Sequence, residues 1–156
     1  MEIKTVEIIE TETILEKAMS LNHSRLTYRL CILLSKYEHR YDVLPKLELE
    51  LNTGRAKPDV SVFENLVFNW EEDVIRYPKP PITAIEVLSP TQAFDELTSK
   101  IRKVYFPGGV RSAWIVVPSI KAVHLFLPDQ PVATFIEGRF YDPACQIELE
   151  IGEIFQ

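Results

Sequence analysis

Residues 82–91 read Ile-Thr-Ala-Ile-Glu-Val-Leu-Ser-Pro-Thr, a short apolar run that holds one acid and ends at Ser89-Pro90. The run is rich in β-branched residues and too short for an ordinary helix, so it predicts a central strand. Strand alternation places Glu86 on one face with Ala84 and Leu88, and its two apolar neighbours on the other. An ionised carboxylate among buried neighbours is costly unless it is paired or binds a metal. Glu86 is therefore a candidate catalytic or metal-binding acid; the alternative is a strand-end position or a pairing with an arginine.

Upstream of this run, hydrophobic spacing predicts a helix, two strands and a long loop. Leucines recur at helical spacing after Asn22, a residue type that caps helix N-termini. Leu47, Leu49 and Leu51 alternate with two glutamates, which indicates a strand with one buried face. The predicted segments are a helix over residues 22–37, strands over 43–51 and 60–63 around a turn at 52–55, and a proline-rich loop over 64–81.

Downstream of the run, the sequence predicts a second helix followed by strands. Ser89 or Thr91 can cap this helix, and Pro107-Gly108-Gly109 ends it. The expected elements are a helix over residues 92–105, hairpin strands over 113–117 and 122–127, a turn over 128–131, a strand over 132–136 and an alternating segment over 146–155. At the start of the chain, residues 3–9 have strand character and residues 11–18 fit a short helix.

Length and element order predict one mixed α/β domain. The chain has 156 residues, an ordinary domain size, and 46% of them are hydrophobic, which can fill a core. The domain is expected to span residues 1–156, with a core at 22–127 and C-terminal strands at 132–156. No apolar run approaches the ~18 residues of a membrane helix. The first residues lack the apolar core of a signal peptide, so a cytoplasmic location and no membrane partner are expected.

The net charge limits the partners that the chain can have. Lys and Arg number 17 and Asp and Glu 23, which gives a net charge of −6. This balance argues against a constitutive nucleic-acid coat protein, whose affinity comes from basic side chains. It does not exclude an enzyme that meets DNA through a local basic face. Such a face is offered around the second predicted helix by Lys100, Arg102, Lys103 and Arg111.

A second acid, Asp59, stands immediately before the strand predicted at residues 60–63. A Pro-Asp pair alone says little, and the copy at Pro128-Asp129 is expected to form an ordinary turn. In Lys57-Pro58-Asp59-Val60 an apolar strand follows at once, which places Asp59 beside the sheet. Two carboxylates on adjacent strands can share a hard divalent cation, so Asp59 and Glu86 together are candidate ligands.

Two lysines, Lys100 and Lys103, lie on the helix predicted after Glu86. A lysine beside paired acids can stabilise charge at an attacked phosphate or orient a water. At about 100° per residue, one side of this helix carries an apolar stripe made of Phe94, Leu97, Ile101, Val104 and Tyr105. Lys100 lies roughly 85° from the centre of this stripe and Lys103 roughly 145°. Lys100 can therefore face a cleft beside the sheet, whereas Lys103 is expected to be solvated. The alternative for Lys100 is an ordinary surface lysine with a buried stem.

Weaker candidates lie upstream of Asp59. His23 and Arg25 begin the first predicted helix and can touch a phosphate, although surface positions are the more ordinary interpretation. Glu48 and Glu50 belong to the strand that precedes Asp59. One of them can join a metal shell, or both can form the charged outer face that strands commonly carry.

Other catalytic and binding classes find no support in the sequence. Ser89 is expected to cap a helix, because no Gly-x-Ser-x-Gly elbow marks a nucleophilic serine. The three histidines lack zinc spacing, and Cys31 and Cys145 alone form neither a disulfide framework nor a four-ligand zinc site. Five scattered glycines make no phosphate-binding loop, and Trp114 is expected to fill the core.

Several motifs match one nuclease family when their spacing is taken together. The matching stretches are Lys57-Pro58-Asp59-Val60, residues 85–91, Asp95, Lys100, residues 105–110 and Trp114-Ile115-Val116. In this combination the chain resembles the Uma-two family of restriction-endonuclease-like proteins, in the PD-(D/E)xK nuclease superfamily. The resemblance spans roughly residues 22–127 and implies a restriction-endonuclease-like mixed sheet core flanked by helices.

The resemblance also implies roles for the candidate residues. Two acids of such a site hold Mg²⁺ or Mn²⁺, and a lysine assists phosphodiester hydrolysis. Asp59 takes the aspartate role and Glu86 that of the second acid. The standard motif has a lysine two residues after this acid, where the chain has Leu88. Lys100 is the candidate for a lysine moved onto the next helix, and Lys103 is its competitor.

The expected function is metal-dependent hydrolysis of phosphodiester bonds, in DNA that is bound transiently. The alternative is an inactive nuclease-fold module that dimerises or associates with nucleic acid, which the acidic balance and the displaced lysine favour. A hydrolase of small phosphoesters would share the same site. A homodimer is suggested by analogy with small nucleases that address two strands.

Overall fold

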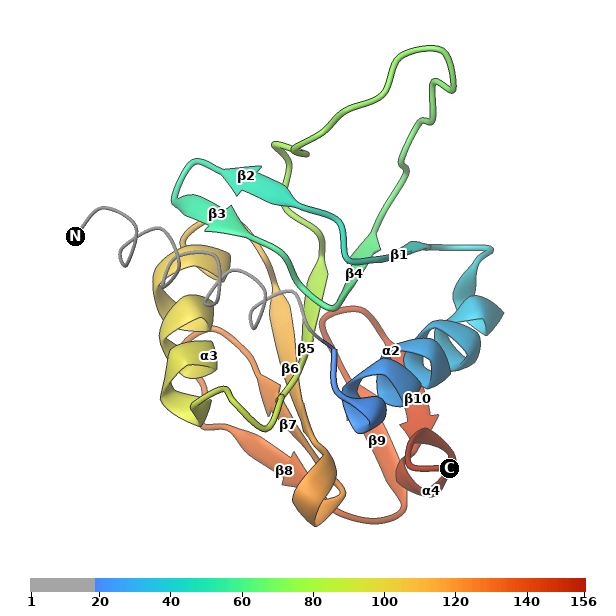
Figure 1. Cartoon of the computed structure of the whole chain (residues 1–156), viewed down its shortest axis with the longest axis vertical. Helices are drawn as coiled ribbons and strands as arrows, with labels where there is room; N and C mark the ends of the chain where they lie inside the picture. Colours follow the sequence, from blue (N-terminus) through green and yellow to red (C-terminus); the bar gives the residue numbers. More distant parts are fainter. Residues whose placement is uncertain (1–18) are drawn as a thin grey trace, which may run out of the picture.

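Six strands form the central sheet of the structure, a computed structural model that describes residues 19–156 (Figure 1). In order across the sheet they are β1 (Asp42–Pro45), β4 (Val60–Phe63), β5 (Thr83–Val87), β6 (Ser112–Val117), β7 (Ala122–Phe126) and β8 (Ala133–Phe135). Within this sheet β5 and β6 run parallel and the other neighbours run antiparallel. The segments predicted at residues 3–9 and 11–18 lie outside the described residues.

The two faces of β5 belong to two layers, as strand alternation predicts. Ile85 and Val87 pack in a buried cluster with leucines of α2 (Leu21–Leu34). Ala84 and Leu88 belong to the other cluster, with residues of α3 (Phe94–Lys100) and of the helical turn η2 (Ile101–Tyr105). Figure 1 shows α2 and α3 on opposite sides of the sheet. Glu86 therefore projects into the layer that α3 and η2 cover.

The C-terminal segment adds to the α2 layer. A hairpin of β9 (Arg139–Asp142) and β10 (Ile147–Glu150) leads into the short helix α4 (Ile151–Ile154). The fully buried Asp142 anchors this hairpin, since its Oδ2 accepts from Trp114 Nε1 at 2.7 Å and from Ser112 Oγ at 2.6 Å. Trp114 thus fills the core, as predicted, and its indole N–H finds an acceptor there.

The first helix begins one residue earlier than predicted and ends sooner. Ser20 caps α2 instead of Asn22, because its side chain accepts from the backbone N–H of His23 at 3.3 Å. A 3₁₀ turn, η1 (Ser35–Tyr37), replaces the last part of the helix predicted over residues 22–37. Because α2 begins at Leu21, His23 lies in its first turn.

The long strand predicted over residues 43–51 is broken into β1 and β2 (Leu49–Leu51). The break lies at Lys46, whose φ of 54° is left-handed and interrupts extended backbone. The predicted burial alternation survives in β2, where Glu50 is exposed between buried leucines. The hairpin turns after β2 and continues into β3 (Gly54–Ala56), a strand that the sequence did not predict.

The second helix was predicted over residues 92–105 with Ser89 or Thr91 as its cap, and this cap is wrong. The N-cap position is Ala93, which makes no side-chain capping bond. The backbone N–H of Gln92 donates to the Ser89 carbonyl at 3.2 Å, so the residues before the helix form a turn. The helix ends at the predicted Pro-Gly-Gly run after η2.

The remaining predictions of secondary structure agree with the structure. The strands at residues 60–63, 82–88, 113–117, 122–127 and 132–136 correspond to β4, β5, β6, β7 and β8, and residues 64–81 form a long loop. The strand β9 was missed. The mixed α/β class is confirmed, and among residues 19–156 no helix has both the length and the apolarity needed to cross a membrane.

Candidate active site

Asp59 and Glu86 meet at the junction of β4 and β5. The antiparallel register pairs Val60 with Ile85, which sets the residue before β4 beside Glu86. The backbone N–H of Asp59 donates to Glu86 Oε1 at 3.3 Å, and Asp59 Oδ2 accepts from the backbone N–H of Val87 at 2.6 Å. Both acids are buried, with exposed fractions of 5% for Asp59 and 4% for Glu86. The sheet thus holds the two predicted acids in direct contact.

Two cationic or potentially cationic side chains contact Asp59. His23 Nε2 lies 3.0 Å from Asp59 Oδ2, brought there by the first turn of α2. Lys46 Nζ donates to Asp59 Oδ1, and the left-handed break before β2 gives it this position. The two sides of the Asp59 carboxylate are therefore occupied by partners from separate elements.

Glu86 receives its partners from the helical layer. Lys100 Nζ lies 3.1 Å from Glu86 Oε2, and the Tyr105 hydroxyl donates to the same oxygen at 2.9 Å. The structure thus places Lys100 beside the acid, on the side that the helical geometry predicts. Lys103 is exposed on the same helical segment.

The end of this helical segment widens, and the widening accompanies the inward position of Tyr105. The backbone N–H of Phe106 donates to the carbonyl of Ile101 at 3.0 Å, an i→i−5 bond. Such wide turns occur often at functional sites. The sequence assigned Tyr105 to an apolar stripe, yet a buried tyrosine hydroxyl needs a partner, and that need was the signal for its role.

The pKa values of the two acids shift in opposite directions. Burial raises the pKa of Asp59, but hydrogen bonds from His23 and Lys46 outweigh it, so the net pKa is lowered. Burial also raises the pKa of Glu86; Lys100 offsets this effect in part, the charge of Asp59 adds to it, and the net pKa is raised. The charge of Asp59 thus disfavours the ionised form of Glu86, and a divalent cation would relieve this repulsion.

The donor set fits Mg²⁺ or Mn²⁺. Asp59 and Glu86 supply carboxylate oxygens, the ligands that hard cations prefer. In the described part of the chain, no group of three or more His, Cys, Asp and Glu side chains is arranged to hold a metal ion. Mg²⁺ does not require such a cage, because one or two carboxylates suffice when water and substrate phosphate complete its shell. Asp59 and Glu86 are the two residues that would hold the ion.

His23 was expected at the surface, and the structure corrects this. The side chain is buried, with an exposed fraction of 6%, and its Nδ1 has no hydrogen-bond partner within residues 19–156. Arg25, expected beside it, donates instead to the carbonyl of Gln156 at 3.0 Å. The signal available for this position was that His23 follows the capping residue Ser20 by three residues, in the helix that covers β4 and β5.

The other secondary candidates pair away from the two buried acids. Glu48 lies 3.9 Å from Arg76 and Glu50 lies 3.5 Å from Arg55. These are half-exposed or exposed ion pairs, which contribute little to stability. They fit the outer charged face that the alternation of this segment predicts.

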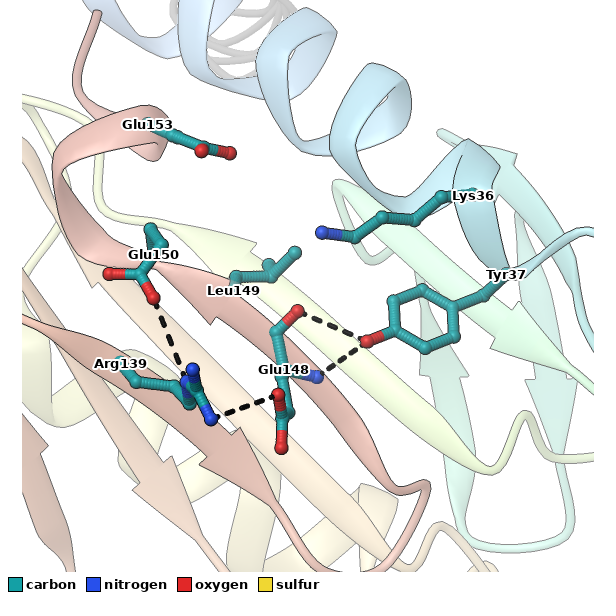
Figure 2. Close-up of a pocket in the computed structure, with 7 residues that line it drawn as sticks. All are labelled: Lys36, Tyr37, Arg139, Glu148, Leu149, Glu150 and Glu153. Atoms are coloured by element: carbon teal, nitrogen blue, oxygen red, sulfur yellow. Dashed lines mark hydrogen bonds and ion pairs between the residues drawn. The ribbon is translucent and has the colours of Figure 1, made fainter.

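A separate polar pocket of about 140 Å³ lies between η1 and the C-terminal hairpin (Figure 2). The Tyr37 hydroxyl donates to the carbonyl of Glu148 at 3.1 Å and accepts from its backbone N–H at 2.8 Å. Arg139 pairs with Glu148 and Glu150 at 3.5 and 3.7 Å. None of the predicted site residues lines this pocket. The hydrogen bonds of Tyr37 join η1 to the C-terminal hairpin at this point.

Comparisons with known proteins point to one family. The model of the family Uma2, described as "Putative restriction endonuclease", matches residues 2–150. A crystal structure from Anabaena variabilis ATCC 29413, described as "a putative nuclease belonging to DUF820", is similar with a TM-score of 0.75 and 22% identity over 88% of this chain and 82% of that chain. No curated protein matches the chain. The structural likeness shows that the chain has a nuclease-like fold.

Proposed function

Because this chain belongs to the Uma2 family, we propose that it is a metal-dependent endonuclease that hydrolyses phosphodiester bonds in DNA. Asp59 and Glu86 hold Mg²⁺ or Mn²⁺, and Lys100 acts beside them. The site is of the PD-(D/E)xK type, with its lysine supplied by α3 in place of the strand position that Leu88 occupies.

The observation that supports this proposal most is the contact between two buried acids on neighbouring strands, each with a cation beside it. Asp59 and Glu86 touch through a 3.3 Å hydrogen bond, while Lys100 lies 3.1 Å from Glu86. A structural ion pair needs one acid and one base. Here two buried acids lie together and the charge of Asp59 helps to raise the pKa of Glu86, which is typical of a site that binds a divalent cation.

Each side chain of the site has a separate task in this proposal. A bound divalent cation supplies charge neutralisation at the phosphate and lowers the pKa of water. Lys100, whose side chain is 30% exposed, can reach solvent and stabilise charge on the attacked phosphate or orient the attacking water. Tyr105 is fully buried and fixes the orientation of Glu86 through its hydroxyl. Lys46 and His23 fix Asp59 and keep it ionised.

A basic surface next to Lys100 supports a nucleic-acid substrate. Arg102 and Lys103 are exposed on η2, and Arg111 is exposed just before β6. Phosphate contacts of this kind position a nucleic acid without reading its sequence. The overall charge of −6 is compatible with this arrangement, because the acidic side chains of residues 64–73 lie on a separate loop.

The substrate class is tested by offering the purified protein several phosphodiesters. Supercoiled plasmid, single-stranded RNA and bis(p-nitrophenyl) phosphate are incubated with Mn²⁺, with Mg²⁺ or with EDTA. We expect plasmid nicking with either metal, none with EDTA, and slower turnover of the small diester. Cleavage of the small diester alone would identify a small-phosphoester hydrolase. Mn²⁺ binding in calorimetry without cleavage of any substrate would contradict the nuclease proposal and favour an inactive nucleic-acid-associated module.

A further inference from the structure

The two oxygens of the Asp59 carboxylate have different sets of donors. Oδ2 accepts from the backbone N–H of Val87 at 2.6 Å, and His23 Nε2 lies 3.0 Å from the same oxygen. Oδ1 accepts from Lys46 Nζ. A carboxylate oxygen has about two lone-pair positions, so the contacts of Oδ2 fill its capacity. Oδ1 is therefore the oxygen through which Asp59 would hold a cation.

The main chain keeps Lys46 beside this oxygen. Lys46 follows β1, the edge strand that pairs with β4, and the register sets Pro45 opposite Val60 (Figure 1). The backbone N–H of Lys46 donates to the carbonyl of Asp59 at 3.1 Å, and its φ of 54° is left-handed. Residues other than glycine adopt this conformation rarely, and such residues cluster at functional sites. Lys46 is thus joined to Asp59 through both its backbone and its side chain.

Lys46 and a divalent cation cannot share Oδ1 without a cost. Both carry positive charge, and like charges repel strongly where little water screens them. Asp59 is only 5% exposed, so screening at this oxygen is weak. Lys46 therefore competes with a divalent cation for Asp59.

Among the donors that the described residues offer to Asp59, Lys46 is the one that can leave. The N–H of Val87 belongs to the backbone of β5, and the His23 side chain is 8% exposed. The Lys46 side chain is 34% exposed, and its ammonium is carried on a flexible four-carbon stem. Lys46 can therefore move toward solvent while the strands keep their places.

Glu86 does not impose the same competition on its lysine. Lys100 and the Tyr105 hydroxyl both contact Oε2, at 3.1 and 2.9 Å. Oε1 accepts from the backbone N–H of Asp59 at 3.3 Å, which is long for such a bond. Glu86 thus keeps an oxygen with spare capacity while Lys100 stays in place. The competition falls on Lys46.

A substrate phosphate would give the displaced Lys46 a new partner. The lysine ammonium binds phosphate well as a point charge, so the lost contact with Asp59 is replaced. A cation and a phosphate would then assist one another at this site, because each favours the position of Lys46 that the other needs. Such coupling is reciprocal between two ligands.

We propose that Lys46 competes with the divalent cation for Oδ1 of Asp59, and that a substrate phosphate takes over the Lys46 ammonium when the cation binds. Without substrate, Lys46 balances the charge of Asp59 and keeps the affinity for free cations low. With substrate, it contacts the phosphate as a second lysine beside Lys100. This proposal rests on the proposed function, because it takes Asp59 and Glu86 as the ligands of the cation.

Calorimetry with Mn²⁺ on the full chain, without nucleic acid, tests the competition. Lys46→Met keeps the apolar stem but removes the ammonium, so it should lower the dissociation constant for Mn²⁺ at least about tenfold. Lys46→Arg keeps a cation beside Asp59 and should stay close to the wild type. Lys57→Met is the matched control, because it removes an exposed lysine two residues before Asp59. Salt screens such a charge, so this variant should change the constant by less than about twofold.

The outcomes separate this proposal from the proposed function. Tighter Mn²⁺ binding by Lys46→Met than by the wild type and Lys46→Arg supports the competition, even where the wild type binds too weakly to measure. Equal or weaker binding by Lys46→Met, when the wild type binds Mn²⁺, would overturn the proposal and leave the metal site in place. Absence of binding in every variant would overturn both. Circular dichroism and thermal melts check that each variant is folded.

A second measurement tests the exchange of partners and needs only the wild type for its first result. Thymidine 3′,5′-bisphosphate carries phosphate groups but no diester bond, so the site cannot cleave it. After correction for Mn²⁺ bound by the probe in solution, a saturating amount should lower the wild-type dissociation constant for Mn²⁺ at least about tenfold. The factor should be several-fold smaller in Lys46→Met, where only direct attraction between cation and phosphate remains. No effect of the probe on the wild type, or equal factors in both proteins, would overturn the proposal.

Discussion

The backbone N–H of Asp59 donates to Oε1 of Glu86 at 3.3 Å, so the two acids are joined across neighbouring strands. The return contact is firmer, because Asp59 Oδ2 accepts from the backbone N–H of Val87 at 2.6 Å. The backbone N–H groups of Asp59, just before β4, and of Val87, in β5, therefore hold both carboxylates. A cation shared by two acids requires this kind of fixed placement, since a supporting shell decides how well ligands are oriented.

The first prediction separates the two lysines. Lys100→Met keeps the apolar stem but removes the charge that lies 3.1 Å from Glu86 Oε2. We expect the rate of plasmid cleavage to fall at least about a hundredfold, as it does when one group that stabilises transition-state charge is lost. Lys103→Met is the comparison variant: it removes a lysine of the exposed basic surface, so it should lower the cleavage rate far less than Lys100→Met does. Loss of cleavage in Lys103→Met with retention in Lys100→Met would reverse the assignment.

The second prediction concerns Tyr105, whose hydroxyl orients Glu86. Tyr105→Phe removes the 2.9 Å hydrogen bond and leaves the ring in place, so the free energy of unfolding should fall by about 1 kcal/mol. In the wild type this hydrogen bond favours the ionised form of Glu86. Its loss should therefore raise the pKa of this acid further.

Calorimetry with Mn²⁺ at several pH values measures how the Tyr105 hydroxyl affects the affinity of the site for the metal. A proton competes with the cation for Glu86, so affinity falls as the pH is lowered, and Tyr105→Phe should show this loss at higher pH than the wild type. Tyr141→Phe changes an exposed tyrosine and should leave the titration unchanged. Identical pH profiles for Tyr105→Phe and the wild type would show that the hydroxyl does not act through Glu86.

Much of the fold was predictable because its core strands carry strong local signals. The stretch at residues 82–88 is apolar on both faces apart from Thr83 and Glu86, and the strands of the 113–127 hairpin are also mostly apolar, so β5, β6 and β7 follow from the sequence. Lys46 shows the limit. Its left-handed backbone splits a segment whose alternation alone indicates one strand, and local pattern does not reveal such a conformation in a residue other than glycine.

The candidate site was predictable where it depends on strand order and less so where it depends on packing. Asp59 and Glu86 were paired from their positions at a strand start and within a strand. The contacts of His23, Lys46 and Tyr105 join elements far apart in the sequence, and spacing along the chain does not encode them. The helical face of Tyr105 assigned this residue to the core. The assignment is correct for the ring, but it does not reveal the hydrogen bond that the hydroxyl donates to Glu86.

The third prediction concerns the buried acid that anchors the C-terminal hairpin. Asp142→Ala leaves Trp114 Nε1 and Ser112 Oγ without their acceptor in a buried site. The free energy of unfolding should fall by at least about 2 kcal/mol, because buried donors lose their partners. Glu137→Ala, in the exposed connection before β9, should change it by less than about 0.5 kcal/mol. Urea denaturation measures both; equal effects would mean that Asp142 does not anchor the hairpin.

The fourth prediction is a pH dependence at Cys145. Burial, together with the nearby Asp142 charge, raises the pKa of this thiol from 9.0 to about 12. Between these values the folded state keeps a proton that the unfolded state releases, so stability is lost as the pH rises. The slope from this group approaches ~1.4 kcal/mol per pH unit.

Urea denaturation at about pH 8 and about pH 10 checks this slope. Cys145→Ala should lose less stability over that interval than the wild type, whatever its stability at the lower pH. Cys31→Ala is the comparison variant. Cys31 is only half-buried and burial alone raises its pKa, so its removal should change this loss of stability less than Cys145→Ala does. If the wild type and Cys145→Ala lose equal stability, the thiol does not keep its proton in the folded state.

The most direct test of the proposed function is nicking of supercoiled plasmid in the presence of Mn²⁺ by the wild type, Asp59→Asn and Glu86→Gln. Glu50→Gln, purified in the same way, controls for contaminating nucleases and for the loss of one carboxylate charge on the exposed face of β2. We predict that the wild type and Glu50→Gln nick the plasmid at similar rates, and that both site variants lose activity while remaining folded. A wild type that nicks no faster than Asp59→Asn and Glu86→Gln would contradict the account.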